Sequence, residues 1–269
     1  MKKLIFILAA VVLLQACASA PITGRKQLMI MPESEAIAGS KEAYIQMLEP
    51  IRQEGRLDKD KALKQRIDLI TGKLITQAIK YRPDTANWEW SVHVIDEPEM
   101  VNAWCMAGGR MAVYTGLIQK INPSDDELAQ VMGHEIAHAL AKHTAEKMSV
   151  SMATNMATTM IGSALNNNEL ALKGAAMAAN VAIGLPNSRT AESEADRIGI
   201  EIAAKAGYNP NAAVTLWKKM GSNSGGSNFD FLSTHPAAEK RMKTLASLVP
   251  KKMPYYQEKV DRPVYKIKH

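Results

Sequence analysis

Apolar residues recur at intervals of three and four along most of this chain, which is the spacing of one face of an α-helix. This pattern predicts long helices over residues 32–48, 63–80, 124–147 and 186–206. Residues 88–95 instead alternate between apolar and polar positions and predict a strand. Gly108 and Gly109 separate two apolar runs and predict a tight strand–turn–strand. The expected fold is α+β and mainly helical, with a small β-sheet next to the helix at 124–147.

The N-terminal segment starts with a basic Met-Lys-Lys and continues as an unbroken apolar run over residues 4–14. This run is too short to cross a bilayer and has the length of a signal-peptide core. It ends in Leu-Gln-Ala-Cys, which predicts a lipoprotein signal peptide at 1–16, acylation of Cys17 and a tether at 17–31. Several acyl chains on one residue would anchor the protein durably. Cleavage after Ala20 is the alternative, which the proline that follows fits poorly.

Composition places the rest of the chain in one globular domain, at 32–250, with a basic tail at 251–269. The 269 residues are 46% apolar and 22% charged, enough to bury a sizeable core. The net charge of +6 is distributed along the chain without basic clusters, so nucleic-acid binding is not expected. A weak attraction to anionic lipid headgroups is consistent with this charge. Cys105 has no cysteine partner and is interpreted as a small buried hydrophobe.

The helix at 124–147 carries the sequence His134-Glu135-Ile-Ala-His138. Ser124 and Glu127 form a capping box at its start. The two histidines are about one helical turn apart, so both imidazoles can reach one small ion. Zn²⁺ suits them because it takes nitrogen ligands tetrahedrally and can leave one position open to water. Glu135 can then act as general base on that water.

A zinc enzyme of this kind needs a third protein ligand, which the next helix can supply. Glu192 and Glu194 are both candidates, and composition alone does not choose between them. Asp196, one turn beyond Glu192, can accept the spare N–H of a ligating imidazole and fix its tautomer. The alternative interpretation is a solvated charged face that includes Glu194, Arg197 and Glu201.

Two further patterns each allow two interpretations. The segment from Asn102 through Gly108 and Gly109 is either a structural hairpin or an edge strand that holds an extended peptide through its backbone. A row of methionines is either helix packing or an adaptable surface for unfolded chains. Its members recur every four residues, at Met148, Met152, Met156 and Met160.

Four of these segments together resemble the zinc metallopeptidases of the Ste/HtpX/BepA/Oma type, peptidase family M48. They are NAWCMAGGRMAVYTGLI at 102–118, HEIAH at 134–138, SRTAESEAD at 188–196 and STHPAAEKR at 233–241. The resemblance covers residues 30–250 and is to bacterial lipoprotein members of the BepA and LoiP kind. It implies a gluzincin-type fold and selects Glu192 as the third ligand. It also places His235 on a mobile lid that can take the open position on the zinc. Ala107 replaces the proline that the family carries before the glycine pair.

The expected protein is a zinc metalloendopeptidase with one Zn²⁺ per chain, anchored in the outer membrane of a Gram-negative bacterium and facing the periplasm. Its expected substrates are unfolded or misassembled envelope proteins; its oligomeric state is open. His235 is a fourth ligand that holds a latent state, released by movement about Gly225 and Gly226, or an oxyanion stabiliser. The remaining alternative is a neighbour of a helix N-cap with no role in catalysis. The alternative function is a chaperone or assembly factor for outer-membrane proteins, with zinc in a structural or regulatory role.

Overall fold

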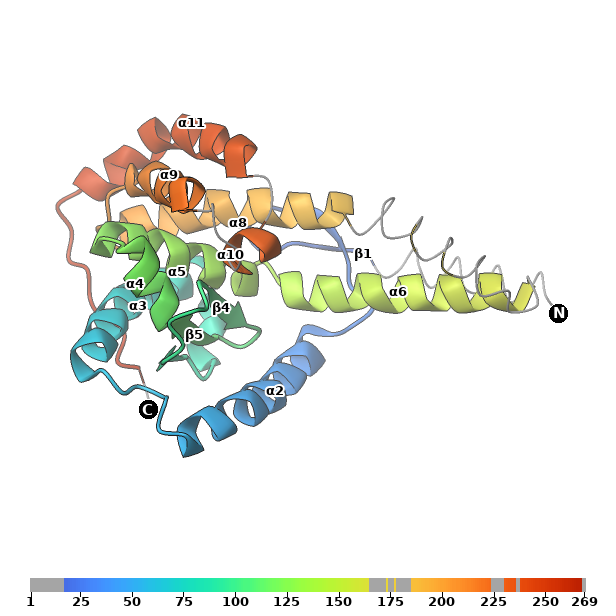
Figure 1. The fold of residues 1–269 in the computed structure, drawn as a ribbon. Coiled ribbons are helices and arrows are strands. Elements are labelled where there is room, and N and C mark those ends of the chain that lie inside the picture. The colour runs from blue at the N-terminus through green and yellow to red at the C-terminus, as the bar shows by residue number, and fades with distance from the viewer. Residues whose placement is uncertain are drawn as a thin grey trace.

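The computed structural model describes residues 17–164, 173, 177, 185–223, 230–235 and 238–267 (Figure 1). Helices surround a small sheet, as the apolar spacing predicts. None of the helices in these described ranges is long and apolar enough to cross a membrane.

The central sheet has three strands in the order β3-β5-β4, comprising β3 (Ser91–Ile95), β4 (Ala103–Met106) and β5 (Arg110–Tyr114). β4 and β5 form the predicted hairpin, with Cys105 opposite Met111. β5 also pairs in parallel with β3, so β4 is an edge strand. The strand predicted at 88–95 is therefore shorter than expected. Trp90 precedes β3, and its indole donates a hydrogen bond to the carbonyl of Thr85.

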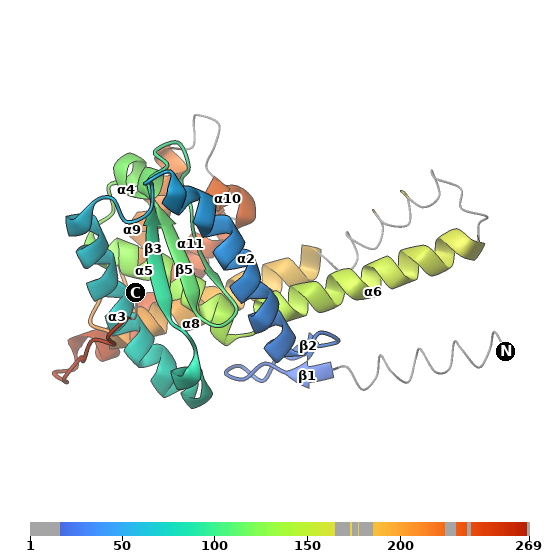
Figure 2. The same cartoon turned by 90° about the horizontal axis from the view of Figure 1, so that it is seen from below.

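Helices cover both faces of this sheet. α2 (Glu33–Gln53) crosses one face (Figure 2), where Tyr44 and Leu48 pack against Ile95 and Ala112. α2 continues five residues beyond the predicted end and includes Pro50 in its last turn, although proline has no backbone N–H to donate one turn back. The other face packs against α3 (Lys61–Tyr81) and α5 (Asp125–Leu140) in the main core. Two short elements connect these layers, η1 (Pro83–Asn87) and α4 (Thr115–Ile121).

α5 begins as predicted but ends earlier. Ser124 accepts from the backbone N–H of Glu127, and Glu127 accepts from that of Ser124, which completes the capping box. The helix stops at Leu140, and Lys142 adopts a left-handed backbone with φ of 61°. A new helix, α6 (His143–Ala164), starts directly after it. The expectation of one helix through residue 147 is therefore wrong, and the break changes the direction of the chain.

The C-terminal half packs against α5. α8 (Leu185–Lys205) lies along it and ends before Gly207, whose φ of +93° suits a glycine cap. α9 (Ala212–Asn223), α10 (Asp230–Thr234) and α11 (Ala238–Gln257) follow. The first residues of the basic tail predicted at 251–269 are therefore helical, because α11 extends to Gln257. Pro250 and Pro254 are one turn apart in that helix.

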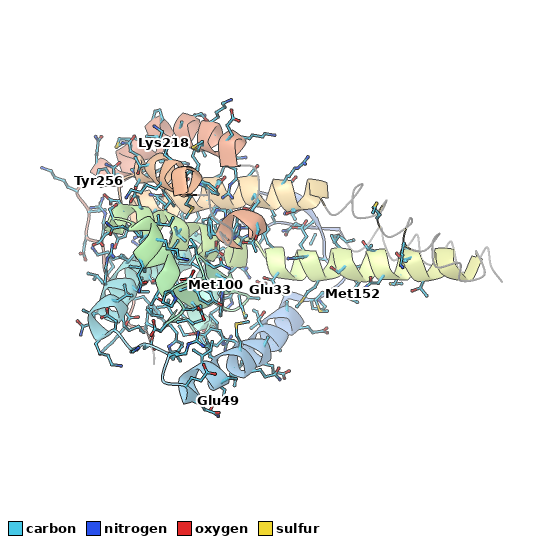
Figure 3. The ribbon with its side chains drawn as sticks, viewed as in Figure 1. Glu33, Glu49, Met100, Met152, Lys218 and Tyr256 are labelled. Carbon is cyan, nitrogen blue, oxygen red and sulfur yellow. The ribbon has the colours of Figure 1, made fainter. Side chains whose placement is uncertain are left out.

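α6 extends away from the body of the molecule in both ribbon views (Figures 1 and 2). Its exposed methionines are Met148, Met152 and Met156, at 37%, 39% and 59%. Met152, labelled in Figure 3, lies on the part of α6 beyond the body. These three side chains therefore do not lie in the core. The side chain of Met160 lies outside the described ones, so the choice between packing and an adaptable surface stays a prediction.

The N-terminal residues form a second, two-stranded sheet. β1 (Cys17–Ser19) and β2 (Lys26–Leu28) pair antiparallel. β2 also contacts α6, so this hairpin lies against the helical layer. The segment predicted as a tether at 17–31 is thus structured; the side chain of Cys17 lies outside the described part.

Candidate metal centre

Both histidines of the α5 motif point their Nε2 atoms at one place. The two Nε2 atoms, of His134 and His138, are 3.0 Å apart. His134 is buried, and His138 is partly exposed. The capped, amphipathic helix thus presents both rings on one side, as the four-residue spacing predicts.

α8 brings Glu192 to the same place. Its Oε2 lies 3.3 Å from Nε2 of His134, and its Oε1 lies 3.4 Å from Nε2 of His138. Burial alone would raise the pKa of Glu192, but hydrogen bonds from His134 and His235 lower it well below its usual value. The structure therefore brings together the ligand set that the resemblance implies.

His235, which follows α10, adds a fourth donor. Its Nδ1 is 2.9 Å from Oε2 of Glu192 and 3.3 Å from Nε2 of His134. Its Nε2 lies 3.4 Å from Oε1 of Glu135. One donor atom from each of His134, His138, Glu192 and His235 lies within 4.8 Å of all the others.

These donors fit a metal ion by their chemistry and spacing. Three imidazole nitrogens and a carboxylate oxygen are the ligands that zinc prefers. Donors about 2.0–2.2 Å from one tetrahedral ion lie roughly 3.3–3.6 Å apart, close to the observed separations. Two imidazole nitrogens that face each other at 3.0 Å cannot both carry a proton. This arrangement therefore favours one metal cation bound by both nitrogens over a separate hydrogen bond at each contact.

Asp196 and Arg241 contact the side chains of this cluster and fix their positions. Nδ1 of His134 lies 3.1 Å from Oδ1 of Asp196, as expected for a carboxylate that fixes the ring. Arg241 donates to both oxygens of Asp196, at 2.8 and 2.6 Å, and lies 2.9 Å from Glu192. Burial opposes the charge of Asp196, but the hydrogen bond from Arg241 keeps its pKa below the usual value. No role was predicted for Arg241 from the sequence. Its position six residues after His235 was the pattern that could have indicated one.

Glu135 has the environment of a general base. Its side chain is buried, and Oε1 accepts no hydrogen bond from the described residues. Burial raises the pKa of this carboxyl. A buried acceptor without a donor next to a metal-binding cluster is well placed to take a proton from a water molecule.

A cleft of about 750 Å³ opens over the cluster. Glu135, His138, Glu192 and His235 are among its lining residues, together with further residues of α6 and α8. Cys105, on the edge strand β4, also faces it. The thiol is buried, as predicted, and burial together with the charge of Glu135 raises its pKa. Asn102, Gly108 and Gly109 are not among the lining residues.

The glycine pair has a packing reason instead. Gly108 and Gly109 have φ of +85° and +82°, which other residues rarely adopt. A Cβ on Gly109 would lie 2.5 Å from the ring of Trp90, and one on Gly108 2.9 Å from Ile37. Ala107 is buried in this turn, so the hairpin forms without the family's proline. Gly225 and Gly226, the predicted hinge, lie outside the described residues.

A second polar cluster adjoins the metal centre and was missed in part. Glu194 was interpreted as a member of a solvated face, but it is only 5% exposed. It contacts His143, Thr23 and Arg25, and these hydrogen bonds lower its pKa to about 2 against the opposing effect of burial. Glu194 therefore does not face the ligand cluster, which agrees with Glu192 as the third ligand.

The comparisons with known proteins agree with this geometry. Mitochondrial metalloendopeptidase OMA1 of Arabidopsis thaliana is 38% identical over 157 residues, 58% of this chain and 31% of that protein. Metalloendopeptidase OMA1 of Bos taurus is 31% identical over 241 residues, 86% of this chain and 45% of that protein. Metalloprotease YcaL of Escherichia coli is 32% identical over 142 residues, 52% of this chain and 55% of that protein.

The chain thus spans about a third to about a half of the length of these relatives. The profile of Peptidase family M48 matches residues 61–249, from the start of α3 to the second half of α11. This match covers well over half of the sequence and includes all four residues of the ligand cluster, so the chain belongs to Peptidase family M48.

Proposed function

We propose that this protein is a zinc-dependent endopeptidase that hydrolyses peptide bonds of misfolded or misassembled envelope proteins. The observation that carries the proposal is the buried carboxylate of Glu135, whose Oε1 accepts no hydrogen bond from the described residues, beside the four-donor cluster and in the lining of a cleft. The relatives named metalloendopeptidase and metalloprotease support the same reaction class.

His134, His138 and Glu192 would hold one zinc ion per chain. Such an ion would polarise the scissile carbonyl and lower the pKa of a neighbouring water molecule. Asp196 and Arg241 fix the ring of His134 and the carboxylate of Glu192, so these side chains keep their positions during turnover.

Glu135 moves the proton. Its carboxylate takes a proton from the attacking water as the new C–O bond forms. The protonated carboxyl then gives this proton to the amine that leaves when the C–N bond breaks. The raised pKa of Glu135 suits both steps, because a carboxyl with a higher pKa is a stronger base when ionised.

An extended peptide would lie along β4. This strand is an edge of the sheet, and its Cys105 faces the cleft. Backbone pairing with an edge strand holds a chain with little dependence on its sequence, which suits unfolded substrates.

His235 would hold the enzyme in a latent state. Its Nδ1 contacts both Glu192 and His134, at the place that a substrate carbonyl or water would need. The proposed activating step is movement of the segment that carries His235 away from the cluster.

The sequence pattern also supports export and anchoring. Acylation of Cys17 would attach the protein to the outer membrane with the domain in the periplasm. Labelling with a radioactive fatty acid, in cells that make the wild type or Cys17→Ala, tests this: label should appear only on the wild type.

The test of the activity is cleavage of unfolded casein by wild type and Glu135→Gln, each with its metal content measured. The variant should keep one zinc per chain and lose activity by roughly 10²–10⁴-fold, the usual contribution of a general base. Substantial cleavage by Glu135→Gln would refute the assignment.

The exposed methionines of α6 favour a second candidate, a chaperone or assembly factor with zinc in a structural or regulatory role. Glu135→Gln separates the two functions. A chaperone would still rescue its clients in the Glu135→Gln form, whereas a protease would not.

A further inference from the structure

A continuous series of polar contacts, buried at Glu194 and His143 and partly exposed at the hairpin, runs from the N-terminal hairpin to the metal centre. Nδ1 of His138 and Nδ1 of His143 are 2.8 Å apart. Nε2 of His143 lies 3.1 Å from Oε2 of Glu194. Glu194 in turn accepts hydrogen bonds from Thr23 and from Nε of Arg25, the latter at 2.6 Å. The zinc-binding motif itself does not account for this series of contacts.

The donors and acceptors in this series of contacts determine which ring nitrogen of His138 carries its proton. The carboxylate of Glu194 can only accept, so Nε2 of His143 carries a proton and donates it. In the neutral ring, Nδ1 of His143 is then an acceptor, and Nδ1 of His138 must donate to it. This leaves Nε2 of His138 unprotonated, with its lone pair toward the ligand cluster.

The opposite arrangement would disable the metal centre. If Nδ1 of His143 donated, Nδ1 of His138 would have to accept, and the proton of the neutral His138 ring would sit on Nε2. That proton would point at Nε2 of His134 and Oε1 of Glu192. Glu194 and His143 therefore do for His138 what Asp196 does for His134.

The hairpin is what keeps Glu194 in place. Arg25 bridges two buried carboxylates from different helices, Glu194 of α8 and Glu146 of α6, and contacts Glu146 at 2.7 and 2.5 Å. Gln27 adds hydrogen bonds to Glu146 and to the carbonyl of Ala141. The hairpin thus joins the start of α6 to α8 directly beside His143.

We propose that the N-terminal hairpin, residues 17–28, is part of the metal centre. Thr23 and Arg25 position Glu194, Glu194 positions His143, and His143 keeps Nε2 of His138 free to bind the metal. This inference rests on the proposed function, since it assumes a metal at the cluster. Residues directly after the proposed anchor would then contribute to metal affinity.

Zinc affinity of the purified full chain, measured by competition with a chromophoric chelator, tests the proposal. His143→Leu removes both contacts and should weaken zinc binding about 10- to 100-fold, the usual effect of losing a group that orients a ligand. His143→Asn keeps an acceptor for His138 and should recover part of that loss. The visible spectrum of the cobalt-substituted protein should change in His143→Leu as well.

The hairpin is tested by Arg25→Gln and Thr23→Val, which should weaken zinc binding by at least about threefold. His93→Leu is the matched control. His93 lies on β3, the other edge strand of the sheet, and pairs with the carboxylate of Asp58, so this change should leave zinc affinity unchanged. Thr23 is an exposed residue, so Thr23→Val keeps the test decisive if a buried variant fails to fold.

Wild-type zinc affinity in His143→Leu would overturn the proposal. Wild-type affinity in both Arg25→Gln and Thr23→Val would overturn the role of the hairpin. These results differ from failure of the proposed function, which would appear as a wild type without stoichiometric zinc or as an active Glu135→Gln.

Discussion

His235 places both ring nitrogens in the metal centre. Nδ1 contacts Glu192 at 2.9 Å, and Nε2 approaches Glu135 at 3.4 Å. The turn of α10 fixes this position, because the backbone N–H of His235 donates to the carbonyl of Phe231 and the two rings lie 4.5 Å apart between centroids. In the proposed latent state, a side chain held in this way would compete with water and substrate for the same place.

We predict that His235→Ala cleaves casein faster than the wild type. If most molecules hold the ring in the cluster, removing it should raise kcat/KM by roughly tenfold, in proportion to the fraction of open molecules. Initial rates of the two proteins at equal zinc content measure this. A slower variant would favour oxyanion stabilisation, and an unchanged rate would exclude both roles.

At the scale of elements, the metal centre depends on a close contact between α5 and α8. A Cβ on Gly199 would lie 2.8 Å from the backbone N and Cα of His134. A Cβ on Gly133 would meet the carbonyl of Gly199 at 3.0 Å. The two helices therefore approach backbone to backbone, which brings Glu192 within reach of the histidines of α5.

We predict that Gly199→Ala separates the helices, because the methyl group would overlap backbone that cannot move aside. The expected cost is about 1–3 kcal/mol of unfolding free energy, together with weaker zinc binding. Thermal unfolding and chelator competition measure both effects. Gly221→Ala on α9 is the control: a Cβ there meets nothing within 4 Å, so this change should leave both unaffected or raise stability slightly.

The break between α5 and α6 also belongs to this scale. The apolar spacing continues past Leu140, yet Lys142 takes a left-handed backbone that costs roughly 1–2 kcal/mol. Contacts distant in sequence offset this cost, among them Arg25 to Glu146 and His143 to Glu194. Local periodicity contains none of these contacts, so it predicts one uninterrupted helix.

At the scale of the whole molecule, the ligand cluster joins α5, α8 and the segment after α10. A metal that binds only the folded chain stabilises it by about 2.7 kcal/mol at a hundred times its dissociation constant. Chelation should therefore lower the Tm by roughly 5–10 °C for a domain of this size. Thermal unfolding with and without a chelator checks this. The Tm of His138→Gln should hardly respond to the chelator; an equal fall in that variant would contradict the prediction.

Much of the fold was predictable because it follows from local patterns. The capping box at Ser124 and the hairpin at the glycine pair both depend on residues close in sequence. The end of α2, predicted at residue 48, and the helical start of the tail predicted from 251 were not. In the structure α2 continues through Pro50 and α11 through Pro250 and Pro254.

The candidate site was also predictable only in part from local patterns. His134 and His138 are four residues apart on one helix, so the common direction of their rings follows from helical geometry alone. Family resemblance was needed to choose Glu192 over Glu194, and the structure shows why they differ. Glu192 points to the histidines, and Glu194 points to His143 and the N-terminal hairpin.

The sequence by itself determined the helix that carries the metal-binding motif, the mainly helical α+β class and the general base candidate. Only the tertiary structure decided which groups surround that motif. Arg25 and Glu194 are 169 positions apart, and His134 and Arg241 are 107 apart. The packing of helices and of the hairpin sets contacts at such separations, and spacing along the chain carries no record of that packing.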